Sequence, residues 1–412
     1  MGARDRGSET AGMYPHRIRQ RTAAIVIGAG PAGLAAAAAL RRHGIAATVL
    51  ERGDSVGTAW RGRYDRLRLN TSRLTSRLPG QRYPRGTGLF PTRDEFVAGL
   101  ERFAERHALD IRPGTQVEAI EHVARGWCVC TSAGALPAVD VIVATGYAGT
   151  PAMPSWPGHE RFAGKLLHSS EYRNAAPFRD RDVLVVGAGS SGMEIAYDLA
   201  EGGAARVRVA VRTPPNIVLR AVGGLPGDPA ALALQRLPPG FADAQGRVLR
   251  RLLLGDLSRY GLPVPAEGPF ARLRRLGVAP AIVDAEVIGA IRQGRIEIVA
   301  GVDALATRGV VLTDGTRIEP HAVVAATGYR CGLEPLVGQL GVLGPRGMPV
   351  AAGGHEAAPG LRFVGYVPVP DQIRRMGFEA RRAAAGIARR RGGEHLNRAS
   401  LRCDARKGAR LA

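Results

Sequence analysis

Two stretches decide the fold: Ala23-Ala-Ile-Val-Ile-Gly-Ala-Gly-Pro-Ala-Gly33 near the start and Asp182-Val-Leu-Val-Val-Gly-Ala-Gly-Ser-Ser-Gly192 near the middle. In each stretch an apolar run typical of a strand ends at the pattern Gly-x-Gly-x-x-Gly, and residues suited to a helix follow. A strand, a glycine-rich turn and a helix in this order are typical of a dinucleotide-binding β-α-β unit. Two such units in one chain predict that electrons pass between two bound nucleotides.

Each glycine of this pattern has a geometric task. The first permits the tight turn, the second lets the backbone approach a pyrophosphate, and the third lets the helix pack against the strand. A glycine-rich turn without a ligand is the alternative, because the chain contains 55 glycines. The predicted phosphate-binding residues are Gly28, Ala29, Gly30, Pro31, Ala32 and Gly33 in the first turn and Gly187, Gly189, Ser190, Ser191 and Gly192 in the second.

The residue that follows the next strand differs between the two units. Glu51 follows the strand at 47–50, and its carboxylate can accept both hydrogen bonds of a ribose diol, which suits FAD or NAD. Arg212, with Thr213 after it, follows the strand at 206–211, and a guanidinium can bind a 2′-phosphate, which suits NADPH. A solvated charge is the alternative for Arg212, because the chain is rich in arginine.

Composition limits the class of protein. With 412 residues, of which 45% are hydrophobic and 23% charged, the chain can bury two domain cores. The formal net charge of +21 would suit a nucleic acid or a membrane surface. However, nearly all of this charge is arginine, and no basic stripe alternates with aromatic residues, which make up only 5% of the chain. We therefore expect no nucleic-acid partner, and the sequence assigns no role to the arginine excess.

Several further site classes receive no support from the sequence. No apolar stretch is long enough to span a bilayer, so we expect no stable membrane insertion. Cysteines at 128, 130, 331 and 403 do not form a disulfide framework in a chain of this size, which favours the reducing cytoplasm. No metal-ligand spacing is recognisable, so no metal site is expected. A dimer is left open.

A strand end of the form Ala-Thr-Gly-Tyr occurs twice, at 144–147 and at 326–329. Chance recurrence of an apolar strand is the alternative to a marker of the passage between two nucleotide domains. We expect an α/β fold with two Rossmann-like, three-layer domains, the NADPH domain being inserted into the FAD domain. The expected boundaries are a flexible arm at 1–20, an FAD-binding domain at 21–152 and 329–390, an NADPH-binding domain at 153–328 with a substrate or lid region near 216–275, and a basic tail at 391–412. Thr92 and Glu95 predict a capping box at the start of a helix.

Four motifs carry a family resemblance. Phe162-Ala-Gly-Lys-Leu-Leu-His168-Ser-Ser-Glu-Tyr172, Tyr64-Asp-Arg-Leu-Arg-Leu-Asn70, the stretch at 254–262 and the Ala-Thr-Gly-Tyr segments occur in the order found in class B flavin-containing monooxygenases. Between about Thr22 and Arg382 the chain resembles the YUCCA-like branch of that family. The resemblance implies FAD and NADPH as cofactors, and it adds to the cofactor site Arg52, Trp60, Asn70, Val117, Ala144, Thr145 and Gly146.

The resemblance also implies an activity. NADPH reduces FAD, and the reduced flavin and O₂ form a C4a-hydroperoxide that oxygenates a small organic substrate at nitrogen or sulfur, or decarboxylates a 2-oxo acid oxidatively. Asn70 is the candidate catalytic residue, because its amide can donate a hydrogen bond near the flavin without titrating. An asparagine that only turns the loop is the alternative. His168 would be a hinge residue or have a generic structural role.

Two departures from the family pattern leave the substrate open. Tyr172-Arg173 stands where ketone oxygenases carry Trp-Pro or Trp-Asp, and Asn70 stands where the plant indole-pyruvate enzymes carry histidine. Two other functions also remain open: an NADPH–flavin reductase or oxidase without oxygen insertion, and a nucleotide-responsive regulator without catalysis. The helix expected near 247–254 is interpreted as a lid rather than as a membrane-surface helix.

Overall fold

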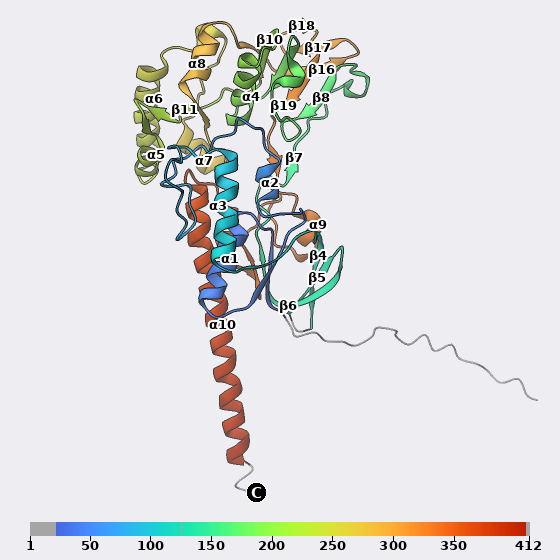
Figure 1. The fold of residues 1–412 in the computed structure, drawn as a ribbon, viewed down its shortest axis with the longest axis vertical. Coiled ribbons are helices and arrows are strands. Elements are labelled where there is room, and N and C mark those ends of the chain that lie inside the picture. The colour runs from blue at the N-terminus through green and yellow to red at the C-terminus, as the bar shows by residue number, and fades with distance from the viewer. Residues whose placement is uncertain (1–21, 125, 409–412) are drawn as a thin grey trace, which may run out of the picture.

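The computed structural model describes residues 22–124 and 126–408, and for residues 22, 23 and 393–408 it describes the backbone alone. The arm expected at 1–20 lies outside the described residues. Figure 1 shows two layered units, one above the other, with helix α10 (Gln372–Gly408) running down from the lower unit. Most of the residues expected to form a basic tail therefore continue this helix.

The lower unit contains an eight-stranded sheet whose central strand precedes the first glycine-rich turn. The main strand order is β21-β22-β6-β1-β2-β3, and β4 joins through β5, which pairs with β6. Helices α1 and α10 pack against each other, and alanines of α1 form much of the core between them. The strands are β1 (Thr22–Ile27), β2 (Ala47–Leu50), β3 (Asp110–Arg112), β4 (Val117–Val123), β5 (Gly126–Thr131), β6 (Gly134–Val143), β21 (Glu356–Ala358) and β22 (Leu361–Phe363); the helices are α1 (Pro31–Arg42), α2 (Thr58–Arg61), α3 (Arg93–Arg106) and α9 (Glu334–Val337).

The upper unit contains a parallel sheet of order β15-β10-β9-β19-β8. One apolar core lies between this sheet and helices α4 and α8, and a second lies between the sheet and a small antiparallel sheet. The elements are β8 (Lys165–His168), β9 (Asp182–Val186), β10 (Arg206–Val211), β15 (Glu297–Ala300), β19 (Ala322–Ala325), β16 (Val302–Ala306), β17 (Gly309–Leu312), β18 (Arg317–Ile318), α4 (Ser190–Glu201) and α8 (Ala285–Arg292).

The two sheets repeat one layout. In each, the strand before the glycine-rich turn lies between the strand of the following β-α-β unit and the strand that ends at Ala-Thr-Gly. A Cβ on Gly28 would lie 2.9 Å from the carbonyl oxygen of Ala144, and one on Gly187 would lie 2.6 Å from that of Ala326. The repeated tripeptide therefore lies against the first glycine of each turn. This confirms the prediction of an α/β fold with two Rossmann-like units.

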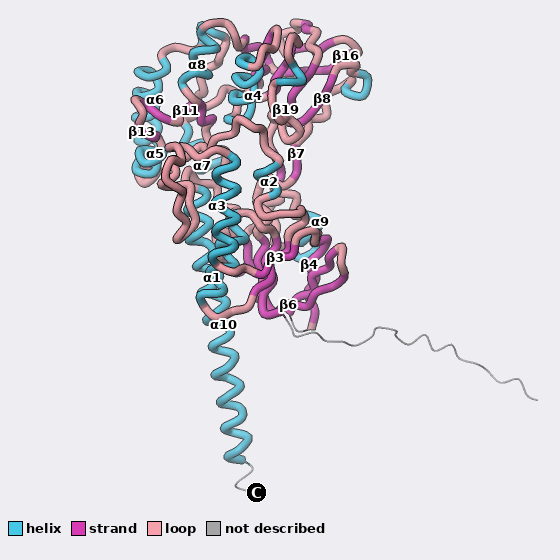
Figure 2. The backbone as a smooth tube through the Cα atoms, viewed as in Figure 1, coloured by secondary structure: helices cyan, strands magenta, loops and turns pink. Residues whose placement is uncertain are grey.

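A separate region fills residues 213–283 between β10 and β15. It contains β11 (Ile217–Leu219), β12 (Ala221–Val222), β13 (Leu225–Pro226), α5 (Asp228–Leu234), α6 (Pro239–Leu254), α7 (Pro269–Leu276) and β14 (Ala281–Val283). Figure 2 shows these helices on the α3 side of the molecule, extending from the upper unit toward the lower. The region therefore stands beside the junction of the two units.

Local sequence explains where α3 begins. The Thr92 hydroxyl accepts a hydrogen bond from the Glu95 backbone N–H at 3.2 Å, and the Glu95 carboxylate accepts one from the Thr92 backbone N–H at 2.8 Å. The predicted capping box is confirmed. Phe96, Leu100 and Phe103 form the buried face of this helix.

Candidate cofactor and substrate site

One cavity of about 2010 Å³ reaches both glycine-rich turns and the 213–283 region. It is large enough for more than one ligand of nucleotide size. Sixteen of the residues predicted from the sequence line it: Gly28, Gly30, Pro31, Ala32, Glu51, Arg52, Trp60, Asn70, Val117, Ala144, Thr145, Gly146, Gly189, Ser190, Ser191 and Gly192.

Five predicted residues do not line the cavity. Gly33 lies behind the first turn, where a Cβ would overlap the carbonyl oxygen of Gly28, and Ala29 is fully buried. Gly187 packs against Ala326. Arg212 and Thr213 are exposed beyond the end of β10. Gly33 and Gly187 therefore allow close packing around the two turns without lining the cavity. Arg212 is exposed to groups outside the cavity.

Both glycine-rich turns leave helix N–H groups without a side-chain cap. Helix α1 follows Gly30 and helix α4 follows Gly189, and neither glycine can supply a capping oxygen. Pro31 occupies the first helical position of α1, where a missing N–H costs nothing. The helix dipole and the remaining N–H groups favour an anion at each helix start, and the cavity lies there. Both turns therefore fit the pyrophosphate of a dinucleotide.

Glu51 contacts the first turn directly, which the sequence pattern did not reveal. Its carboxylate accepts the backbone N–H of Ala29 at 2.7 Å and that of Gly53 at 2.9 Å. The side chain is buried at the cavity wall. Glu51 thus holds the turn in place and lies at the wall of the cavity.

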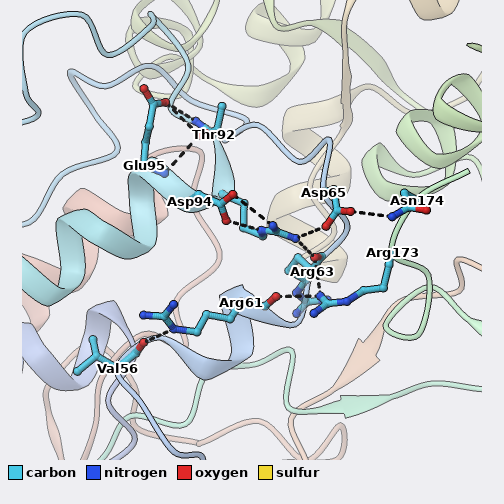
Figure 3. A network of polar contacts seen from close by, with 10 residues as sticks. Val56, Arg61, Arg63, Asp65, Thr92, Asp94, Glu95, Arg173 and Asn174 are labelled. Atoms are coloured by element: carbon cyan, nitrogen blue, oxygen red, sulfur yellow. Dashed lines mark hydrogen bonds and ion pairs between the residues drawn. The ribbon is translucent and has the colours of Figure 1, made fainter. Parts of the chain in front are cut away.

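The loop that carries Asn70 connects the units. As Figure 3 shows, Arg173 donates hydrogen bonds to the carbonyl oxygens of Arg61 and Arg63, both at 2.8 Å, and Asn174 donates to Asp65 at 2.8 Å. Arg173 belongs to the pair Tyr172-Arg173 at which the chain departs from the ketone-oxygenase pattern. The structural contribution of Arg173 is to hold the start of the loop.

Asn70 lies farther along this loop and lines the cavity with an exposed side chain. Among the described residues its amide has no hydrogen-bond partner. The neighbouring hydroxyls, in contrast, are engaged: Ser72 donates to the Asp228 carboxylate at 2.9 Å, and Thr75 donates to the same carboxylate. The Asn70 amide can therefore donate to a bound group without breaking a contact within the protein.

A buried polar cluster lies beside Asn70's loop and connects three parts of the chain. The Tyr64 hydroxyl donates to Glu194 of α4, and Glu194 forms an ion pair with Arg220, which also lies 3.1 Å from Asp284. The Arg220 side chain is 1% exposed. Burial raises the pKa of Tyr64 to about 12, so this hydroxyl stays protonated and keeps donating. A further hydrogen bond joins the second turn to the 213–283 region: the Ser190 hydroxyl accepts the Ile282 backbone N–H at 2.8 Å.

His168 of the family-specific motif lies at the end of β8. Its Nε2 lies 3.0 Å from the Gly328 carbonyl oxygen, and its Nδ1 lies 3.1 Å from the Ser170 backbone nitrogen. These partners require a hydrogen on Nε2 and a lone pair on Nδ1, which is the neutral ring. Burial lowers the pKa of His168. His168 does not line the cavity, so its contacts are those of a linker rather than a catalyst.

The 213–283 region supplies a large apolar part of the cavity wall. Ile217, Leu234, Leu253, Leu254, Phe270 and Leu273 line the cavity together with Arg220, Arg247 and Arg250. Helix α6 also exposes Val248 and Leu252 on its outer side.

Across the described residues, no helix has the length and apolarity needed to cross a bilayer. Within the same residues no three His, Cys, Asp or Glu side chains gather as a metal site would require.

Comparisons with known proteins place this geometry in a family. The model of the family described as flavin-binding monooxygenase-like matches residues 127–337, and that of pyridine nucleotide-disulphide oxidoreductase matches residues 25–218. Indole-3-pyruvate monooxygenase YUCCA1 of Oryza sativa subsp. japonica is 38% identical over 74% of this chain and 76% of its own length. Probable indole-3-pyruvate monooxygenase YUCCA1 of Arabidopsis thaliana is 33% identical over 83% of this chain and 84% of its own.

A solved structure agrees. The flavin-containing monooxygenase from Stenotrophomonas maltophilia has a TM-score of 0.67 and 25% identity, with 89% of this chain and 97% of the other covered. Two glycine-rich turns on one cavity, the repeated sheet layout and these similarities agree on one family and its cofactors, FAD and NADPH. The chain belongs to the flavin-binding monooxygenase-like family and is a flavin-dependent monooxygenase.

Proposed function

We propose that the protein binds FAD at the first glycine-rich turn and NADPH at the second, and uses O₂ to oxygenate a small organic substrate in the shared cavity. The observation that carries the proposal is the single cavity lined by Glu51 of the first unit, Ser191 of the second and the 213–283 region. Nicotinamide, flavin and substrate then have access to one space. The division into an FAD-binding part at 21–152 and 329–390 and an NADPH-binding part at 153–328 is part of this proposal.

The oxidant we propose is a flavin C4a-hydroperoxide, which bound FAD supplies after reduction and reaction with O₂. The chain's task is to keep water from this group and to donate a hydrogen bond to it. Asn70 is suited to the second task, because its amide faces the cavity without an internal partner among the described residues. The apolar side chains of α6 and α7 are suited to the first.

The substrate class follows from the cavity wall and the relatives. Apolar side chains such as Leu253 and Phe270 suit an apolar or aromatic body, and the arginines at 247 and 250 suit an anionic group. Two relatives carry indole-3-pyruvate in their names. Together these points favour oxidative decarboxylation of a 2-oxo acid over oxygenation at nitrogen or sulfur.

The test separates oxygen insertion from simple reduction. The FAD-loaded protein is reduced anaerobically with NADPH and mixed with O₂ and NADP⁺ while the flavin spectrum is followed. A hydroperoxide spectrum that decays faster with a 2-oxo acid, and product formed in step with NADPH consumption, are expected. Direct return to oxidised flavin with all NADPH recovered as hydrogen peroxide, across amines, sulfides and 2-oxo acids, would indicate a reductase or oxidase instead.

A further inference from the structure

A second cavity of about 480 Å³ lies between the β21–β22 hairpin and helix α10. Its wall shares no residue with the cofactor cavity. The hairpin side contributes Arg362 on β22 with Gly354, His355 and Glu356, and the helix side contributes Arg382, Gly386 and Arg389. Three arginines and one carboxylate therefore line the same open groove.

Arg362 forms the floor of this cavity. Its side chain is only 7% exposed, yet its pairing is incomplete. Nη1 donates to the Gly354 carbonyl oxygen at 3.2 Å and Nη2 lies 3.3 Å from Glu356, while the buried Nε has no hydrogen-bond partner among the described residues. Glu356 is in turn shared, because it also accepts the Gly360 N–H at 2.8 Å. The buried guanidinium thus pairs with Glu356 but keeps one N–H, at Nε, without a partner among the described residues.

Helix α10 is shaped to accept this guanidinium. Gly386 lies opposite Arg362, and a Cβ built on it would come within 2.9 Å of the Arg362 Cζ atom. Arg382 and Arg389 stand one turn before and one turn after Gly386, which places them on the same side of the helix. The Arg362 guanidinium fills the space that a side chain at position 386 would take, and it lies between Arg382 and Arg389 in the groove wall.

The two helix arginines keep charge available at this groove. Arg382 donates to the Gly353 carbonyl oxygen at 3.3 Å and to Nε2 of His355 at 2.8 Å, both uncharged acceptors. Arg389 forms no ion pair or hydrogen bond with another described residue. Burial lowers the pKa of Arg362 most, the carboxylates of Glu356 and Asp140 raise it, and the guanidinium groups of Arg390 and Arg389 lower it. Among the residues that line the groove, three arginines face one carboxylate, so positive charge is in excess there.

We propose that this groove is a binding site for a small phosphate-bearing anion, separate from the phosphates of the cofactors. Guanidinium groups bind phosphate oxygens through paired N–H groups, and three of them converge here. The volume exceeds that of a phosphate alone, so the phosphate ester of a small molecule fits as well as the free ion. Either occupant would neutralise Arg362 and join the hairpin to α10.

The test is a calorimetric titration of the holoenzyme saturated with FAD and NADP⁺, so that the cofactor phosphate sites are filled. Inorganic phosphate and glycerol phosphate are titrated separately in a phosphate-free buffer, with sodium chloride keeping the ionic strength constant. Saturable binding of one equivalent is expected. Tighter binding of glycerol phosphate would identify a phosphate ester as the occupant, and equal binding would identify free phosphate.

A pair of double variants makes the result specific. Arg382→Ala with Arg389→Ala should raise the dissociation constant by at least about tenfold, because two of the three guanidinium groups are removed. The matched control is Arg374→Ala with Arg381→Ala, since these exposed residues lie on the same helix at the same spacing and contact Phe378 instead of the groove. Absence of saturable binding to the wild type, or equal weakening in both double variants, would overturn the proposal.

Discussion

The imidazole Nε2 of His168 lies 3.0 Å from the carbonyl oxygen of Gly328, although 160 residues separate them in the chain. This hydrogen bond joins the end of β8 to the second Ala-Thr-Gly segment. It therefore connects the family-specific motif to the point at which the chain returns from the upper unit to the lower. The contact therefore gives the His168 ring a structural role that depends on its protonation state.

Protonation of His168 should destabilise the protein. Burial lowers the pKa below its ordinary value of 6.5, so the fold favours the neutral ring, and its contribution is present above pH 6.5 and lost as the pH falls through the folded-state pKa. The thermal midpoint should therefore fall between pH 7 and mildly acidic pH, and His168→Gln should remove part of this slope. The exposed His43 provides the control, and the slope of His168→Gln is compared with that of His43→Gln. Equal slopes in all three proteins would contradict the assignment.

Gly192→Ala should damage the second glycine-rich turn. A Cβ there would overlap the carbonyl oxygen of Gly187 and lie 3.2 Å from the Ala326 Cβ, so the helix must move away from the strand. We expect a loss of about 2 kcal/mol or more in NADPH binding, measured by the dissociation constant for NADP⁺. Gly289→Ala in α8 meets nothing within 4 Å and should bind NADP⁺ as the wild type does. Unchanged affinity in Gly192→Ala would show that the turn does not hold the nucleotide.

Arg212→Ala should reduce the preference for NADPH over NADH. Arg212 is exposed at the end of β10, where a 2′-phosphate would lie if the nucleotide follows the second turn. The loss in kcat/KM for NADPH should be about 2 kcal/mol, or about thirtyfold, with little change for NADH. Arg308→Ala removes another exposed arginine of the upper unit as a charge control. An equal loss for both nucleotides would refute 2′-phosphate recognition.

Asn70→Ala should leave flavin reduction by NADPH nearly intact and increase hydrogen peroxide formation. The reason is that the amide would act after reduction, as a donor to the oxygenated flavin. The ratio of peroxide to NADPH consumed measures the effect. Leu74→Ala is the control, because Leu74 lies on the same loop, is 55% exposed and does not line the cavity. A peroxide ratio equal to that of the wild type would show that Asn70 only turns the loop.

Local patterns predicted the parts of the fold that depend on neighbouring residues. The strands before Gly28 and Gly187, the helices after them and the Thr92–Glu95 capping box all follow from residues within a few positions of one another. Family motifs added Asn70 and Ala144 to the candidate site, and both line the cavity.

The remaining features depend on contacts between distant segments. Tyr64 and Glu194 are 130 residues apart, and Arg220 comes from a third segment, so no spacing in the sequence indicates their cluster. The contact of Glu51 with the Ala29 N–H was similarly hidden, because a ribose-binding glutamate and one that also supports the turn have the same pattern. The groove around Arg362 was also hidden, since it requires a hairpin and a helix to meet.

Between the two sheets the chain crosses twice, and the crossings pair as β7 (Thr150–Pro151) and β20 (Tyr329–Arg330), antiparallel to each other. Each crossing begins at an Ala-Thr-Gly segment that supports the first glycine of a phosphate turn. A swivel of one nucleotide-binding unit over the other must therefore twist this narrow ribbon. The same short segments thus carry the chain between the units and support both phosphate turns, so a change in the angle between the units would act directly beside both turns.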